Sequence, residues 1–202
     1  MKKFVIVMFT ILFVSFVSEV NTNASILMDT NNYEYVTFRN LVIENFYQIN
    51  KYKYKDNLIY EIYNSYNFYS AINYIRIKHH KKPLRIELLR LIFLQWIEME
   101  SGFNKNAISK SGCYGLLQIK YSVWKKHFKL KSYKQLFNYR TNIRISKNIF
   151  IKYLEKSNGN FYLALKYYNE GPFSNSMFSQ YSNVIISNAQ KKLNKLYIFF
   201  ND

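Results

Sequence analysis

The spacing of apolar residues predicts that the chain is almost entirely helical after residue 36. Residues such as Phe38, Leu41 and Val42 recur every three or four positions, as they do along one face of a helix. The same spacing predicts further helices within residues 58–75, 84–101, 121–128, 141–156, 161–168 and 177–197. No segment alternates apolar and polar residues as a strand would, so we expect an all-α fold.

The first 24 residues have the pattern of a secretory signal peptide. Lys2 and Lys3 precede an apolar run over residues 4–17, and Thr22 and Ala24 supply small residues for a cut after position 24. The run is shorter than the roughly 20 residues that span a bilayer. We therefore expect an exported protein of the periplasm or cell envelope, with no membrane span after cleavage. An uncleaved N-terminal anchor is the alternative.

The net charge of the chain indicates which kinds of partner it attracts. The 202 residues include 29 Lys and Arg but 12 Asp and Glu, which gives a net charge of +17. An exported protein this basic attracts anionic polymers such as cell-wall carboxylates or anionic lipids, whereas nucleic acid is not an expected partner. A solvated lysine-rich surface is the simpler explanation of the same excess. Cys113 is the one cysteine, so no disulfide can form within the chain.

Glu100 is the candidate acid. At about 100° per residue it falls on the apolar stripe of the helix predicted over residues 84–101, together with Phe93 and Ile97. The opposite, solvated arc is expected to hold Glu87, Arg90, Gln95 and Glu98. Burial and the C-terminal end of the helix dipole both raise the pKa of a carboxyl group and favour a protonated general acid near neutral pH. A buried glutamate paired with a lysine or arginine is the alternative.

A glycine-rich loop follows the candidate acid. Three of the five glycines, Gly102, Gly112 and Gly115, lie within residues 102–115. Gly102 is well placed as a left-handed helix cap, and the clustering marks a backbone that bends tightly.

These residues carry a resemblance to a known family. Residues 100–112 and 115–119 resemble the catalytic segment of the soluble lytic transglycosylase family, which has a lysozyme-like, goose-type helical domain. Asn142-Ile143 and the run Tyr168-Asn169-Glu170-Gly171 follow in the family's order, and Tyr181 and Val184 resemble its closing helix. The resemblance covers residues 84–190. It implies a catalytic domain over residues 81–202, preceded by a helical extension over residues 25–80 that packs on it.

The resemblance also implies a reaction and a site. Glu100 would cleave the bond between N-acetylmuramic acid and N-acetylglucosamine without water, metal or cofactor, and leave a 1,6-anhydro end. Ser101 and Gln118 would contact the acetamido group, and Tyr168 would orient Glu100 and the sugar. Asn169 would support the loop formed by residues 168–171. Gly115 and Leu116 would let the backbone approach the glycan. A core tyrosine and a satisfied buried amide are the alternatives for Tyr168 and Gln118.

Departures from the family pattern keep two other functions open. Leu117 stands where methionine is usual, and Glu170 replaces a small residue and adds a carboxylate. Glu170 leaves room for a goose-type lysozyme that uses water on the same fold. The other alternative is a non-catalytic basic protein that binds the cell envelope. The expected partner is the glycan strand of peptidoglycan. The biological role could be general wall turnover or action with a secretion, conjugation or phage apparatus, and the sequence does not distinguish these roles.

Overall fold

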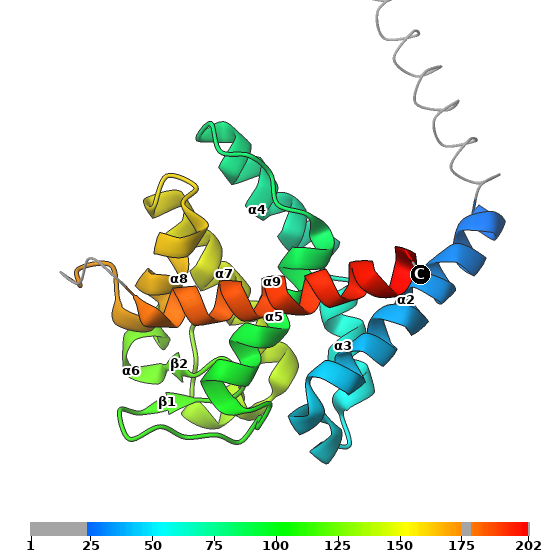
Figure 1. Ribbon diagram of the computed structural model, residues 1–202. Coiled ribbons are helices and arrows are strands. Elements are labelled where there is room, and N and C mark those ends of the chain that lie inside the picture. Colours follow the sequence, from blue (N-terminus) through cyan, green and yellow to red (C-terminus); the bar gives the residue numbers. More distant parts are fainter. Residues whose placement is uncertain (1–23, 175–178, 202) are drawn as a thin grey trace, which may run out of the picture. The chain divides into compact units, whose positions relative to one another are not determined.

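The computed structural model describes residues 24–174 and 179–201 (Figure 1). The predicted signal peptide therefore lies outside the described residues, except for Ala24. The chain divides into one compact unit over Met1–Leu41 and a second over Val42–Asp202. Helix α2 runs over Ala24–Asn45. Among the described residues, no helix is both long enough and apolar enough to cross a membrane.

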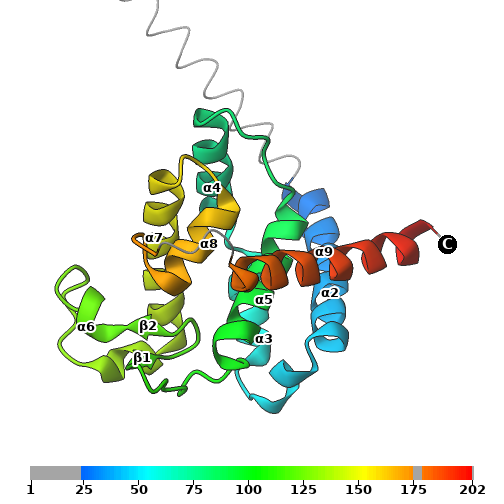
Figure 2. The ribbon, with the colours of Figure 1, turned by 60° about the vertical axis from the view of Figure 1, so that its left-hand side comes forward.

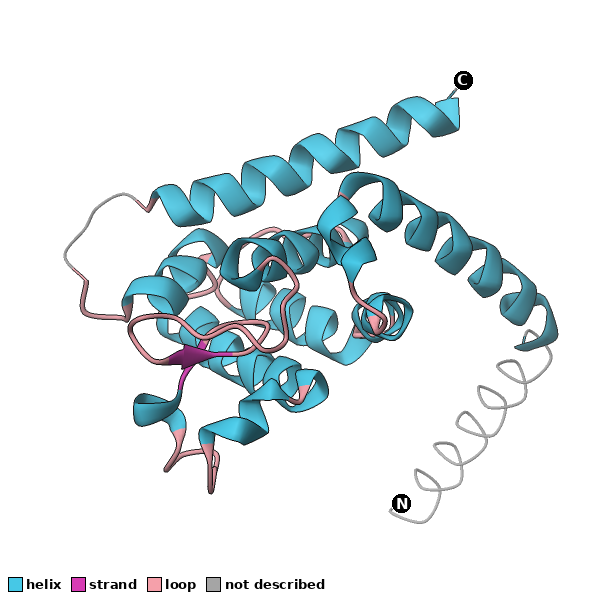
Figure 3. Cartoon of the chain, turned by 90° about the horizontal axis from the view of Figure 1, so that it is seen from below, coloured by secondary structure: helices cyan, strands magenta, loops and turns pink. Residues whose placement is uncertain are grey.

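The second unit is built from helices, as the all-α prediction requires (Figures 1 and 3). In chain order they are η1 (Tyr47–Lys51), α3 (Lys55–Tyr63), α4 (Tyr66–Lys78), α5 (Ile86–Ser101), α6 (Tyr121–Trp124), η2 (Tyr133–Phe137), α7 (Tyr139–Lys156), α8 (Phe161–Glu170) and α9 (Gln180–Asn201). Two short strands, β1 (Cys113–Tyr114) and β2 (Ile119–Lys120), pair antiparallel with Cys113 opposite Lys120. Strands of two residues are too short to show an alternating pattern, so the sequence could not predict them.

Helix α5 occupies the centre of the second unit's packing. It contacts both α9 and α3, and the ribbon shows α9 crossing it (Figure 2). The predicted apolar stripe is buried at Leu89, Phe93 and Ile97. The helix ends in a left-handed Gly102 with φ 56° and ψ 36°, which confirms the predicted cap.

The expectation of one solvated arc on this helix is wrong for Arg90 and Gln95, which are both buried. The Arg90 guanidinium lies 3.8 Å from the centre of the Tyr63 ring and donates to the Tyr63 carbonyl at 3.1 Å. The Gln95 side chain accepts a hydrogen bond from Lys192 of α9 at 2.6 Å. Because α3 and α9 both pack on α5, polar residues on its flanks become buried and find partners there.

The start of α5 also differs from the prediction. The helix begins at Ile86 rather than at residue 84. The Leu84 amide donates to the Asn73 side-chain oxygen at 2.8 Å, and the Asn73 side-chain amide donates back to the Leu84 carbonyl at 2.8 Å. These two bonds hold Leu84 in an extended connection beside α4, so the helix starts after it.

Candidate active site

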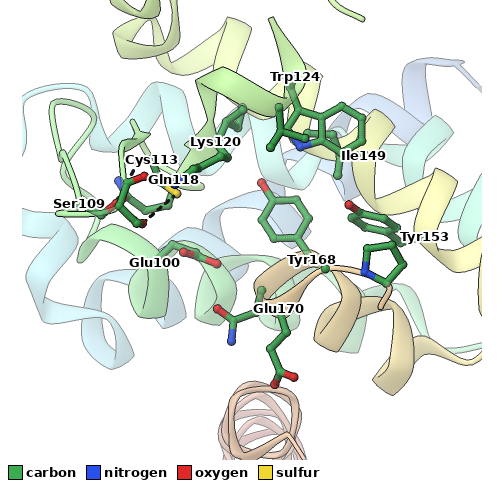
Figure 4. Close-up of a pocket in the computed structure, with 16 residues that line it drawn as sticks. Glu100, Ser109, Cys113, Gln118, Lys120, Trp124, Ile149, Tyr153, Tyr168 and Glu170 are labelled. Carbon is green, nitrogen blue, oxygen red and sulfur yellow. Dashed lines mark hydrogen bonds between the residues drawn. The ribbon is translucent and has the colours of Figure 1, made fainter. Parts of the chain in front are cut away.

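A cavity of about 610 Å³ opens beside the C-terminal end of α5 (Figure 4). Its walls come from α5, from the loop and strands over residues 109–120, and from α6, α7, α8 and the turn after α8. The polar and aromatic lining residues are Glu100, Ser109, Ser111, Cys113, Gln118, Lys120, Trp124, Tyr153, Tyr168, Asn169 and Glu170. Such a mixture of hydrogen-bonding and aromatic groups suits a carbohydrate ligand.

Glu100 lies in the last turn of α5, where the residue is partly buried and lines the cavity. The Tyr181 hydroxyl of α9 donates a hydrogen bond to its Oε1 atom. Burial raises the pKa of Glu100 to about 7, and the hydrogen bond from Tyr181 opposes this rise. The nearby Trp96 indole N–H also favours the carboxylate, although it has no well-formed hydrogen bond among the described residues.

The alternative to a catalytic Glu100 was a buried glutamate paired with a lysine or arginine. Within residues 24–174 and 179–201, no lysine or arginine nitrogen lies within 4.0 Å of its carboxyl group. A group with a pKa near 7 can both give and accept a proton near neutral pH. The carboxyl group therefore has the properties of a general acid and base.

The loop that faces Glu100 is shaped by Gly115. Its φ of +81° is in the left-handed region, and a Cβ atom there would lie 2.2 Å from both the Asn142 side-chain nitrogen and the Leu136 carbonyl oxygen. Only glycine fits such a site, so Gly115 allows the loop to lie directly against α7 and the end of η2.

Asn142 of α7 holds that loop in place. Its Oδ1 accepts the Leu117 amide at 2.9 Å, and its Nδ2 donates to the carbonyls of Tyr114 at 2.9 Å and Leu136 at 3.0 Å. The side chain is fully buried, so all three bonds are protected from water. The resemblance pointed to Asn142 as a family position, but only the structure shows this positioning role.

Tyr168 and Gln118 both line the cavity and both bond to the same loop. The Tyr168 hydroxyl donates to the Leu117 carbonyl at 2.7 Å and lies 3.0 Å from the Ser146 hydroxyl oxygen. Burial, and then the charge of Glu100, raises the Tyr168 pKa well above its usual value. The Gln118 side chain donates to the Gly115 carbonyl at 2.8 Å. The hydroxyl that bonds to Glu100 is that of Tyr181. The resemblance had placed Tyr181 on a closing helix, but it did not predict this contact.

Asn169 and Glu170 also line the cavity. The Glu170 carboxylate accepts a hydrogen bond from the Ser174 hydroxyl at 2.6 Å. It points away from Glu100 (Figure 4). Glu170, the second carboxylate noted in the sequence, therefore lines the cavity without facing Glu100.

Three of the predicted site residues do not line the cavity. The Ser101 hydroxyl bonds to the Ile97 carbonyl of its own helix at 3.3 Å, and Leu116 is fully buried. Gly115 packs against Asn142. The structure brings together Glu100, Gln118, Tyr168 and Asn169, whereas glycan contacts of Ser101, Gly115 and Leu116 stay predictions. In the described part of the chain, no three histidine, cysteine, aspartate or glutamate residues are grouped as metal ligands would be.

Comparison with known families gives a match that covers the residues of the cavity. The sequence model of the Transglycosylase SLT domain family matches residues 73–190, which is more than half of the chain. The match begins within α4, and the domain boundaries at residues 25, 80 and 81 stay predictions. Searches of curated proteins and of solved structures found no match. With its helical fold and a family match that spans every element of the cavity, the chain belongs to the Transglycosylase SLT domain family.

Proposed function

We propose that this protein is a lytic transglycosylase that cleaves the β-1,4 bond between N-acetylmuramic acid and N-acetylglucosamine in peptidoglycan. The cleavage uses no water and leaves 1,6-anhydro-N-acetylmuramic acid ends. Membership of the family implies transglycosylase-type action on peptidoglycan. The observation that carries the finer proposal is a single acid, Glu100, with a pKa of about 7 at a cavity whose other carboxylate points away.

In the first step, Glu100 donates its proton to the glycosidic oxygen. The bond from C1 of muramic acid to that oxygen breaks, and the N-acetylglucosamine side leaves as an alcohol. The acetamido oxygen of the muramic acid bonds to C1 and stabilises the positive charge. This substrate-assisted route is an exception to the usual pair of enzyme carboxylates, and it needs one acid.

In the second step, the Glu100 carboxylate takes the proton of the C6 hydroxyl group of the same sugar. The C6 oxygen then bonds to C1, the acetamido oxygen leaves, and Glu100 is again protonated. A pKa near 7 suits both steps because the same group must lose and regain a proton within each turnover.

The neighbouring residues support this assignment. The Tyr181 hydroxyl donates to one carboxyl oxygen of Glu100, a residue that lines the cavity, and so limits the rotation of that carboxyl group. Gln118 and Asn169 supply side-chain amides at the cavity wall, where they can bond to acetamido and hydroxyl groups of a sugar. Tyr168 and Asn142 keep the loop that bears Gln118 in place.

The test is a digest of purified peptidoglycan sacculi followed by mass analysis of the released muropeptides. A transglycosylase leaves ends that are one water lighter than the reducing ends of a lysozyme. We expect anhydro ends from the wild type, near-complete loss with Glu100→Gln, and normal activity with Glu87→Gln on the exposed side of the same helix. Reducing ends would identify a goose-type lysozyme, and no release of muropeptides by either the wild type or Glu100→Gln would identify a binding protein without catalysis.

We further propose that the protein is exported to the periplasm or cell envelope, where this substrate lies. The support is the N-terminal pattern of Lys2, Lys3 and the apolar run over residues 4–17. N-terminal sequencing of the protein recovered from the envelope tests it. A mature chain that starts after residue 24 is expected, and recovery of the intact chain from the cytoplasm alone would contradict it.

A further inference from the structure

The positive charge of the chain is concentrated in one stretch of sequence. Residues 101–154 contain no aspartate or glutamate, yet they hold 12 of the 29 lysines and arginines. The other 148 residues hold the remaining 17 basic and all 12 acidic residues, which leaves them at +5 of the total +17. A lysine-rich composition alone would spread the acidic residues evenly along the chain, so the excess of positive charge is a feature of this stretch.

That stretch forms one wall of the active-site cavity. It comprises β1, β2, α6, η2 and most of α7, each of which contacts at least one other member of the set. Both ribbon views show β1, β2 and α6 lying together (Figures 1 and 2). Lys120 and Trp124 line the cavity itself, and the Lys120 ammonium donates to the Ser111 carbonyl. The Lys152 ammonium lies 5.5 Å from the centre of the Trp124 ring.

Directly after Trp124 the chain presents a basic edge, which we define as Lys125, Lys126, Lys129, Lys131 and Lys134. All five residues are exposed. In the part of the chain that the structure describes, none of them has a carboxylate within 4.0 Å, and Lys147 alone in the stretch is ion-paired, at 3.8 Å from Glu61. Uncompensated charges of one sign beside a cavity concentrate ligands of the opposite sign there.

We propose that the basic edge binds the free carboxylates of the peptide stems on the glycan strand that occupies the cavity. This inference rests on the proposed function, since the stems hang from the muramic acid residues of that strand. A four-residue stem in extended conformation spans roughly 13–14 Å, and the edge begins at Lys125, directly after the cavity-lining Trp124. Lysine ammonium groups on flexible stems suit carboxylates that are themselves mobile, because they need no fixed two-point geometry.

Position favours this ligand over other anionic polymers. Because the edge continues from a cavity-lining residue, a strand held at Glu100 brings its own stem carboxylates to the lysines. The edge therefore increases the capture of strands that carry intact stems, and it does so without taking part in the chemistry at Glu100.

The experiment measures sedimentation with sacculi at low salt in a Glu100→Gln background, so that binding is read without cleavage. The edge variant replaces Lys125, Lys126, Lys129 and Lys131 by glutamine. The matched control replaces Lys51, Lys53, Lys81 and Lys82, four exposed lysines outside the stretch, and so loses the same charge. We expect the edge variant to bind roughly tenfold or more weakly, at the lower end of the range for electrostatic focusing at clefts. The control should bind like its parent, and equal thermal unfolding of all forms verifies that the fold is kept.

Two treated substrates identify the ligand. Sacculi with chemically amidated carboxyl groups should bind the parent and the edge variant equally, whereas removal of phosphodiester-linked polymers by hydrofluoric acid should leave the difference unchanged. The inference is overturned if the edge variant matches the control on intact sacculi, or if phosphate removal and not amidation abolishes the difference. Failure of the proposed function would appear instead as missing anhydro ends in the digest, which this binding assay does not measure.

Discussion

The burial of Glu100 predicts that replacing this acid by glutamine stabilises the protein as the pH rises. The folded chain holds the carboxyl proton up to a pKa of about 7, whereas the unfolded chain releases it near the ordinary 4.5. Between these values the folded state binds more protons, so wild-type stability falls from about pH 4.5 to about pH 7 and then levels off. Glutamine cannot ionise and still offers an oxygen to Tyr181, so the variant lacks this decline.

The size of the effect follows from the same two values. At about 1.4 kcal/mol per pH unit, the interval from 4.5 to about 7 corresponds to about 3 kcal/mol. This is the largest effect expected, because part of the side chain reaches the cavity. For a chain of this size, about 3 kcal/mol corresponds to a rise in Tm of about 6–12 °C.

The assay compares thermal or urea unfolding of wild type and Glu100→Gln at pH 4.5 and pH 8. We expect a small difference at pH 4.5 and a clear gain for the variant at pH 8. Glu87→Gln on the exposed side of α5 is the control for the loss of one carboxylate from the same helix, and it should not show the gain in stability at pH 8 that burial predicts for Glu100→Gln. If Glu100→Gln also differs from wild type equally at both pH values, Glu100 is ionised in the folded protein and the reasoning from burial fails.

Three further predictions concern Tyr181, which contacts Glu100, and Gly115 and Asn142, which shape the loop that faces it. Tyr181→Phe removes the hydrogen bond that lowers the Glu100 pKa, so the alkaline fall in kcat/KM should move to higher pH; an unmoved pH profile would contradict this. Gly115→Ala places a methyl group where no space exists at φ +81°, so it should cost at least about 2 kcal/mol in urea unfolding and abolish cleavage. Asn142→Ala removes three buried hydrogen bonds at about 1 kcal/mol each, so a loss of about 3 kcal/mol is expected, and a loss below about 1 kcal/mol would show that Asn142 does not hold the loop.

Much of the helical fold could be predicted because its signal is local. The apolar stripe of α5 and its glycine cap need only the residues of one helix and the turn after it, and both are confirmed. The burial of Arg90 could not be predicted, because it depends on α3 packing against α5. A helical projection assigns a polar residue to solvent, and it contains no information about a second helix that covers that face.

Some features of the candidate site could likewise be predicted from the sequence, and others required the structure. The position of Glu100 on a buried stripe could be predicted from spacing alone. The resemblance named Gln118, Tyr168 and Asn169 as site residues, and the structure places all three at the same cavity as Glu100. The contact between Tyr181 and Glu100 joins residues 81 positions apart, and the contacts of Asn142 depend on the path of a glycine-rich loop. The basic stretch over residues 101–154 is visible in the sequence, whereas its place at the cavity wall required the structure.

The central claim is that Glu100 acts alone with the acetamido group of the substrate, and a comparison of two matched variants tests it most directly. Muropeptides released from sacculi by Glu100→Gln and by Glu170→Gln are quantified by mass. Both substitutions neutralise one carboxylate that lines the cavity and keep an oxygen that accepts hydrogen bonds. We predict that Glu170→Gln releases anhydro ends at nearly the wild-type rate while Glu100→Gln releases almost none. Comparable loss in both variants, or reducing ends from the wild type, would contradict a single-acid transglycosylase.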